Sequence, residues 1–177
     1  MNPLKRLFFE ETLRHWHFED IRKASELSRE RVNFYLKELV RVDLVTRVKL
    51  RKKMPYYSAN RKNSHFLIEK KLFGLSMLED LFAYINTCSG IKSAILFGSF
   101  ARGDWGKSSD IDLFVYGDDT EFKNGEFELA LKRDLQLFSF NNPKDMIKVL
   151  DPNAIPNIIK GFNIKGTLEP FEVLIHD

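Results

Sequence analysis

The chain has 177 residues, of which 44% are apolar and 30% charged, and its formal net charge is +3. This composition excludes a disordered polypeptide, and the length suits one domain or two small ones. The apolar runs are far shorter than the ~20 residues of a membrane span and the first ten residues lack a signal peptide's apolar centre, so we expect a cytoplasmic protein that does not enter a membrane. The single cysteine, Cys88, excludes an internal disulfide and a cysteine-based zinc site.

The charges are unevenly distributed along the chain. Residues 1–61 carry 15 lysines and arginines against 8 acidic residues, whereas residues 62–177 carry 13 against 17. A basic part followed by an acidic part indicates two modules with different partners. We therefore expect a first domain over 1–61, a helical connector over 62–89 and a second domain over 90–177.

The first module reads as three short helices. Apolar residues at helical spacing predict a helix after Pro3, then a second helix. The inward residues of that second helix are Phe18, Ile21 and Ala24. Ser28 is a suitable N-cap for a third helix. Its predicted inner face consists of Val32, Tyr35, Leu36, Leu39 and Val40.

A basic hairpin follows the third helix. Leu44–Arg51 alternates as a strand, a basic turn follows, and Tyr56–Ala59 can return as the second strand. The helix's outer face and the turn combine positive charge for phosphates with guanidinium and amide groups that can bind base edges. The residues predicted to contact DNA are Arg29, Arg31, Asn33, Lys37, Arg51, Lys52 and Lys53.

The stretch 21–45 resembles the winged helix-turn-helix of prokaryotic transcription regulators. The resemblance implies DNA binding; a solvated basic face and a protein-docking module are the alternatives. Asp43 stands where such domains often have glycine, which predicts a strained turn. We interpret the neighbouring His15 and His17 as part of a turn rather than a metal site, because residues two apart do not share a helix face.

Residues 63–87 have a helical pattern, with Gly74 as a candidate break. The apolar residues of this connector are Leu67, Leu72, Leu75, Leu78, Leu81, Phe82 and Ile85. Such a stripe can pack on both modules, and it can also form a homodimer.

The second module contains two predicted strands around a glycine-bearing turn. Ala94–Phe97 reads as a buried strand that ends at Gly98-Ser99, where backbone N–H groups and a hydroxyl can approach phosphate oxygens. In the next strand, alternation places Asp110 and Asp112 on one face. Because adjacent carboxylates repel one another, this pair predicts a site for a hard divalent cation, Mg²⁺ or Mn²⁺.

Gly98-Ser99, ten further residues, and Asp110-Ile-Asp112 resemble the motif of the minimal nucleotidyltransferases, a branch of the DNA polymerase beta-like superfamily. The resemblance covers about residues 90–175. It implies an α/β (α+β) fold with a short mixed sheet, catalytic and metal-binding roles for Asp110 and Asp112, and ATP or another NTP as donor. Gly98, Ser99 and Ser109 are then expected to bind the nucleotide. Arg102 and Lys107 could help neutralise the triphosphate, and a solvated loop charge is the equal alternative for each.

The superfamily usually adds a third carboxylate on a later strand, and here that strand is predicted over 135–139. The matching position holds Gln136, a neutral amide that cannot act as a general base. Asp134, one step away in the same phase, is the alternative third metal ligand, although Arg133 and Asp134 also fit an ordinary helix end. The tail predicts short helices over 143–150 and 153–160 and strands over 163–168 and 171–175.

Two functions follow as hypotheses. The first is a metal-dependent nucleotidyltransferase that transfers NMP, most often AMP, to a hydroxyl of a protein or nucleic acid, coupled to DNA binding by the winged helix. The resemblance implies an antitoxin role with a HEPN-domain toxin as acceptor. The alternative is a winged-helix transcription regulator whose catalytically weakened second domain senses nucleotide.

Overall fold

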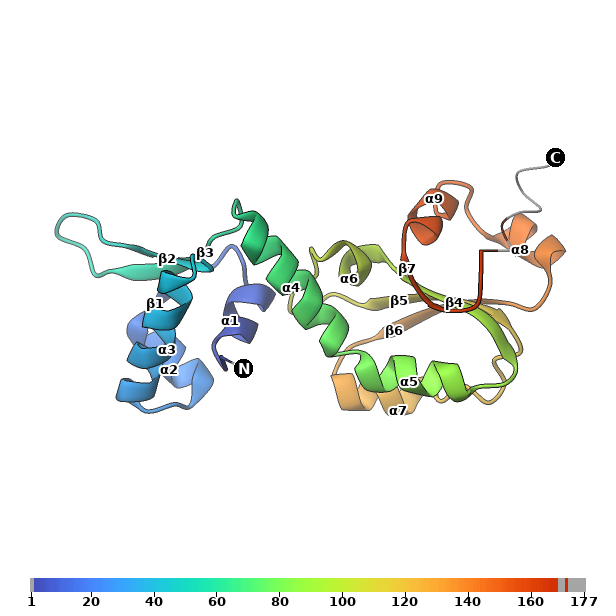
Figure 1. The fold of residues 1–177 in the computed structure, drawn as a ribbon, viewed down its shortest axis with the longest axis horizontal. Helices are drawn as coiled ribbons and strands as arrows, with labels where there is room; N and C mark the ends of the chain where they lie inside the picture. The colour runs from blue at the N-terminus through green and yellow to red at the C-terminus, as the bar shows by residue number, and fades with distance from the viewer. Residues whose placement is uncertain (1, 169–170, 172–177) are drawn as a thin grey trace. The chain divides into compact units, whose positions relative to one another are not determined.

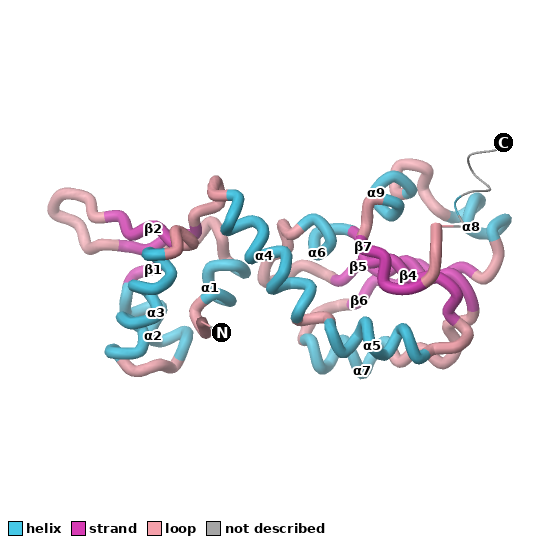
Figure 2. The backbone as a smooth tube through the Cα atoms, viewed as in Figure 1, coloured by secondary structure: helices cyan, strands magenta, loops and turns pink. Residues whose placement is uncertain are grey.

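The computed structural model of the protein describes residues 2–168 and 171. Its internal contacts divide the chain into two compact units, Met1–Lys70 and Lys71–Asp177. The division falls inside helix α4 (Ser64–Ser76), within the stretch that the sequence pattern assigns to a connector. Figures 1 and 2 trace the elements of each unit.

The first unit combines helices with a small antiparallel sheet. In chain order its elements before α4 are α1 (Lys5–Glu10), β1 (Trp16–His17), α2 (Phe18–Ser25), α3 (Arg29–Arg41), β2 (Val45–Val48) and β3 (Tyr56–Ala59). The predicted hairpin of β2 and β3 forms (Figure 1), and the strand order β1-β3-β2 adds β1 as a third strand.

Helix α3 begins as the sequence predicts, because the Ser28 hydroxyl accepts a hydrogen bond from the Arg31 backbone N–H. Its buried residues are Val32, Leu36 and Leu39. Two apolar assignments were wrong: Val40 is 37% exposed, and Ala24 on α2 is exposed. Both residues lie at the edge of their helix's apolar stripe, where spacing alone does not fix burial.

The expected turn around Trp16 is instead a short strand. Trp16 pairs with Tyr57 and His17 with Tyr56, which adds β1 to the hairpin. The Trp16 ring is buried, with the Arg14 guanidinium carbon 3.8 Å from its centre. Two residues are too few to give an alternating pattern, so this strand depends on its tertiary partner β3.

Asp43 adopts the left-handed conformation that the sequence suggests, with φ of +57°. The side-chain amides of Asn60 and Asn63 donate to its backbone carbonyl at 3.1 and 3.2 Å, and that of Asn63 also donates to its carboxylate at 2.6 Å. These bonds compensate for the strain of a non-glycine residue at this turn.

The second unit is built on a four-stranded mixed sheet. After α4 come α5 (Glu79–Thr87), β4 (Ile91–Phe97), α6 (Gly98–Arg102), β5 (Ile111–Gly117), α7 (Asn124–Leu131), β6 (Leu135–Phe140), α8 (Pro143–Val149), α9 (Ile155–Ile159) and β7 (Phe162–Lys165). The strand order is β6-β5-β4-β7, with β5 and β6 parallel and the other neighbours antiparallel. The predicted short mixed sheet is therefore confirmed. Of the predicted strand over 171–175, all but Phe171 lies outside the described residues.

The two faces of this sheet have different roles. On one face, Ile95, Phe97 and Phe114 pack with residues of α8 and α9, and Figure 1 shows α5 and α7 on the other side. Register places Asp112 beside Phe97 on β4 and beside Gln136 on β6. Asp112 and Gln136 therefore lie on the same face of the sheet as the apolar residues that α8 and α9 cover.

Gly74 does not break the connector helix. It lies buried within α4, and the helical pattern is interrupted later, between Ser76 and Glu79. A Cβ atom at Gly74 would be 2.4 Å from the Trp105 ring nitrogen, so glycine permits this ring to pack on the helix. Of the predicted stripe, Leu78, Leu81 and Ile85 are buried, whereas Leu67 and Leu72 are exposed. No helix in the described part of the chain has the length and apolar character of a membrane span.

Candidate active site

The turn after β4 places a glycine directly against a carboxylate. Gly98 has φ of +67°, and a Cβ atom there would be 1.9 Å from Oδ2 of Asp112. No side chain could occupy that position without displacing Asp112. The structure thus brings together Gly98-Ser99 and Asp112, which twelve residues separate in the sequence.

The two predicted acids lie at the start of β5. Asp110 directly precedes the strand, Asp112 is its second residue, and both are half-buried. Burial raises the pKa of Asp112 above its usual value, the charge of Asp110 raises this pKa further, and the charge of Arg102 lowers it. Ile111 and Leu113 are buried on the opposite face, as predicted. The site therefore concentrates negative charge that a cation would compensate.

Gln136 contributes a hydrogen-bond donor to this cluster. Its side-chain amide nitrogen donates to Oδ2 of Asp110 at 2.9 Å. It also pairs in register with Asp112 across β5 and β6. One oxygen of Asp110 is therefore stabilised by a neutral donor beside the pair.

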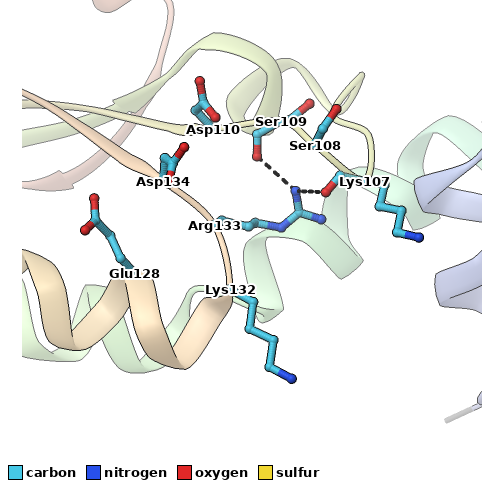
Figure 3. Close-up of a pocket in the computed structure, with 8 residues that line it drawn as sticks. All are labelled: Lys107, Ser108, Ser109, Asp110, Glu128, Lys132, Arg133 and Asp134. Atoms are coloured by element: carbon cyan, nitrogen blue, oxygen red, sulfur yellow. Dashed lines mark hydrogen bonds between the residues drawn. The ribbon is translucent and has the colours of Figure 1, made fainter.

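Asp134 as the alternative third metal ligand stays a prediction. Among residues 2–168 and 171, no three His, Cys, Asp or Glu side chains converge in a way that could hold a metal ion. Asp134 is exposed, and its backbone carbonyl accepts a hydrogen bond from the Ile111 amide at 2.9 Å. Asp134 and Asp110 line the same pocket, and Figure 3 shows their side chains near one another.

The donor set still suits one kind of cation. Mg²⁺ is commonly held by one or two protein carboxylates, with water and substrate phosphates completing its octahedron. Asp110 and Asp112, half-buried on one face beside an accessible glycine turn, provide that set. The residues therefore fit Mg²⁺ or Mn²⁺ as a cation shared with a phosphate-bearing substrate.

The other predicted nucleotide-binding residues surround this centre at different places. Arg102 donates to the Asp104 carboxylate at 3.2 Å, and both side chains are exposed. Ser109 accepts a hydrogen bond from the Gly106 amide at 2.8 Å, which gives its hydroxyl a role within the loop. A pocket of about 300 Å³ beside Asp110 is lined in part by Lys107 and Ser109, and Figure 3 shows the Lys107 side chain pointing away from Asp110.

The sequence interpretation missed Arg133. Its side chain is only 7% exposed, and its Nη1 lies 2.9, 3.0 and 2.9 Å from the carbonyl oxygens of Gly106, Lys107 and Ser109 (Figure 3 draws two of these bonds). A sequence signal was present, because Arg133 is in phase with Leu135 and Leu137.

The residues predicted to contact DNA are placed on the first unit. Arg29, Arg31, Asn33 and Lys37 are all exposed on α3, and the basic residues 51–53 are exposed between β2 and β3. Arg29 forms an ion pair with Glu19 at 2.6 Å. A groove of about 260 Å³ between α3 and the hairpin is lined by Asn33, Lys37, Arg41, Arg47 and Tyr57 together with Leu36 and Val40. Arg41 and Arg47 were not predicted, because neither lies on the outer face or in the turn.

The raised pKa of Asp112 predicts a pH-dependent stability. The Asp112 carboxyl ionises less readily in the folded chain than in the unfolded chain. The resulting loss of folding stability is therefore complete above the pKa of the folded chain and disappears as the pH falls to the pKa of the unfolded chain. We expect metal-free Asp112→Asn to melt at a higher temperature than the wild type at pH 7, with the difference vanishing towards pH 4. Thermal melts followed by circular dichroism check this, and an Asp112→Asn melt at or below the wild-type temperature at pH 7 would contradict it.

Comparisons with known proteins show the family of the second unit. The family described as "Polymerase beta, Nucleotidyltransferase" matches residues 79–168, just over half of the chain. The protein belongs to this polymerase beta-type nucleotidyltransferase family. The match includes every residue of the candidate site and begins at α5, within the expected connector.

Individual proteins match this chain over different lengths. The chain is 61% identical over 28 residues to "Putative protein adenylyltransferase MJ0604" of Methanocaldococcus jannaschii, which is 16% of this chain and 28% of that protein. The chain thus spans little more than a quarter of the relative's length. Two solved structures are similar at a TM-score of 0.36: a mutant of the toxin-antitoxin MntA-HpeT (18% identity, 58% of this chain, 78% of that chain) and a toxin-antitoxin with AMP-PNP (21%, 59% and 78%).

Proposed function

We propose that the protein is a metal-dependent nucleotidyltransferase that transfers the NMP of an NTP, most often AMP from ATP, to a hydroxyl group. The observation that carries this proposal is the contact of the Gly98 backbone with the Asp112 carboxylate, with Asp110 on the same face. A glycine turn accepts phosphate oxygens, and two carboxylates accept the cation that accompanies those phosphates.

The chain's residues would divide the work as follows. The backbone N–H groups of Gly98-Ser99 and the Ser99 hydroxyl donate to the triphosphate, and Arg102 offsets its charge. Asp110 and Asp112 hold Mg²⁺ or Mn²⁺, which supplies charge neutralisation at the phosphates and a lower pKa for the attacking hydroxyl. The hydroxyl oxygen bonds to the α-phosphorus, the bond from that phosphorus to the β-phosphate oxygen breaks, and pyrophosphate leaves. The hydroxyl proton passes to solvent, because Gln136 cannot accept it.

We propose a protein as the acceptor, with a HEPN-domain toxin as the leading candidate. The sequence motif and the short match to an adenylyltransferase support this choice. Incubation with α-labelled ATP, Mg²⁺, the product of the neighbouring gene and total RNA identifies the acceptor. We expect label in the protein band; label only in RNA would replace the protein acceptor by RNA ends.

A second candidate function is nucleotide sensing without transfer. The hydrogen bond from Gln136 to Asp110 favours it, because a neutral amide stands beside the metal pair and occupies one of its oxygens. Under this alternative, Mg²⁺ and ATP change the affinity for upstream DNA while no acceptor is labelled. Gln136→Asp would then introduce label transfer that the wild type lacks.

We propose that the first unit is a winged helix that binds DNA. Helix α3 and the β2-β3 hairpin present a basic surface, and the order of helices and strands suits this class. Lys37, Arg41 and Arg47 line one groove between helix and hairpin whose lining contains no acidic residue. Such a groove can follow a phosphate backbone.

Removal of the cations on α3 tests this proposal. We expect Arg31→Ala and Lys37→Ala each to weaken binding to upstream DNA and to reduce the slope of log affinity against log salt by about 1, because each removes one phosphate contact. Fluorescence anisotropy over a salt series measures both quantities. Lys160→Ala, an exposed cation of the other unit, is the control. An unchanged salt slope in both α3 variants would indicate a solvated face.

A further inference from the structure

The side chain of Arg133 ties a loop rather than facing solvent. This loop connects α6 to β5 and ends at Asp110. Nη1 of Arg133 lies within 3.0 Å of three of its carbonyl oxygens. The guanidinium carbon also lies 5.3 and 5.6 Å from the ring centres of Phe100 and Trp105. A planar group that donates at its edge and stacks on its face is held in one orientation.

The position of Asp110 depends on this attachment. Asp110 precedes the first residue of β5, so it lies outside the strand's own pairing. On one side, the Ser109 carbonyl accepts from Arg133 at 2.9 Å. On the other side, the Ile111 amide donates to the Asp134 carbonyl at 2.9 Å. Two consecutive residues, 133 and 134, therefore fix the backbone on both sides of Asp110.

Arg133 and Asp134 also directly precede β6, the strand that contains Gln136. Gln136 lies three residues after Arg133 on β6 and donates to the Asp110 carboxylate at 2.9 Å. A shift of the loop would change both the backbone of Asp110 and the partner of its side chain. We call the bonds from Arg133 to the loop carbonyls the clamp. Loss of the clamp would therefore change the distance between the carboxylates of Asp110 and Asp112.

We infer that Arg133 is a positioning residue that sets the affinity of the Asp110-Asp112 pair for a divalent cation by clamping the loop before β5. The inference rests on the proposed metal-dependent function. Arg133, a buried residue outside the sequence motif, thereby positions Asp110, one of the two acids of that motif.

The direction in which cation affinity changes in Arg133→Gln distinguishes the clamp from a purely electrostatic effect of the arginine charge. Arg133→Gln removes a positive charge close to the acids, and charge alone would then make cation binding tighter. Loss of the clamp predicts the opposite, a roughly tenfold weaker affinity, as is common when a residue behind a metal ligand is lost. Arg133→Lys keeps the charge but loses the planar fork, so we expect it to weaken binding as well.

Lys132 provides a matched control. It is exposed, it neighbours Arg133, and its φ of +55° is one that asparagine tolerates. Lys132→Asn therefore removes the same unit of charge near the same pocket without touching the clamp. We expect its cation affinity to equal or slightly exceed that of the wild type.

The experiment is a titration of the full chain with Mn²⁺, followed by electron paramagnetic resonance of the free ion, together with hydrogen exchange of the Gly106, Ser109 and Ile111 amides. We expect weaker Mn²⁺ binding and faster exchange in Arg133→Gln and Arg133→Lys than in Lys132→Asn. Circular dichroism confirms that each variant is folded, and Arg133→Lys keeps the test decisive if Arg133→Gln does not fold. Wild-type Mn²⁺ affinity in both Arg133 variants would overturn the inference alone. If Asp110→Asn and Asp112→Asn bound Mn²⁺ as tightly as the wild type, the proposed metal site would be overturned as well.

Discussion

Asp110→Asn and Asp112→Asn should each reduce the rate of label transfer from α-labelled ATP by at least about 100-fold. Each substitution removes one of two carboxylates that would hold the cation, and a catalytic metal contributes several kcal/mol at the transition state. Initial rates at saturating ATP over a range of Mg²⁺ concentrations measure the loss. A requirement for more Mg²⁺ in the variants would locate the defect in metal binding.

Asp119→Asn is the matched control for these variants. Asp119 lies beyond the far end of β5 in the same unit and is half-buried like the two acids. We expect it to retain the wild-type rate because its carboxylate lies on none of the surfaces that form the site. Equal rates in Asp112→Asn and Asp119→Asn would refute the assignment of the site.

Gly98→Ala should abolish transfer and destabilise the second unit. An L-residue in the left-handed conformation costs about 1–2 kcal/mol, and the added methyl would overlap the Asp112 carboxylate, with overpacking costs of about 1–3 kcal/mol. The free energy of unfolding should therefore fall by about 2–5 kcal/mol. Urea unfolding measures the loss of stability, and the label assay at a temperature where the variant is folded measures the loss of transfer.

Gly125→Ala separates this local effect from a general response to alanine. Gly125 lies in α7, has no atom within 4 Å of an added Cβ, and does not require a positive φ. Alanine should stabilise that helix by roughly 0.5–1 kcal/mol and leave transfer unchanged. If Gly98→Ala behaved like Gly125→Ala, the close approach of backbone and carboxylate would have no functional role.

The sequence predicted the elements whose patterns are local. Ser28 indicates the start of α3, and alternation around Asp110 and Asp112 indicates β5, although the strand itself begins at Ile111, one residue after Asp110. The spacing of Gly98-Ser99 from this pair predicted the glycine turn, and the structure adds that the turn touches Asp112. These features follow from periods of 3.6 and 2 and from the conformational freedom of glycine.

Features that depend on distant partners could not be predicted in the same way. Gly74 looks like a helix break, yet its role is to admit the Trp105 ring. Arg133 looks like a charged helix end, yet its partners are carbonyls 24 to 27 positions earlier in the chain. In each example, tertiary packing decides between two local interpretations.

The most direct test of the account compares two labels in one reaction. The protein, its acceptor, Mg²⁺ and ATP labelled at either the α- or the γ-phosphate are incubated, and the label retained by macromolecules is measured for the wild type and for Asp112→Asn. Nucleotidyl transfer predicts that only the α-label is retained and that Asp112→Asn abolishes it. Retention of the γ-label, or α-label that survives in Asp112→Asn, would contradict a nucleotidyltransferase centred on Gly98, Asp110 and Asp112.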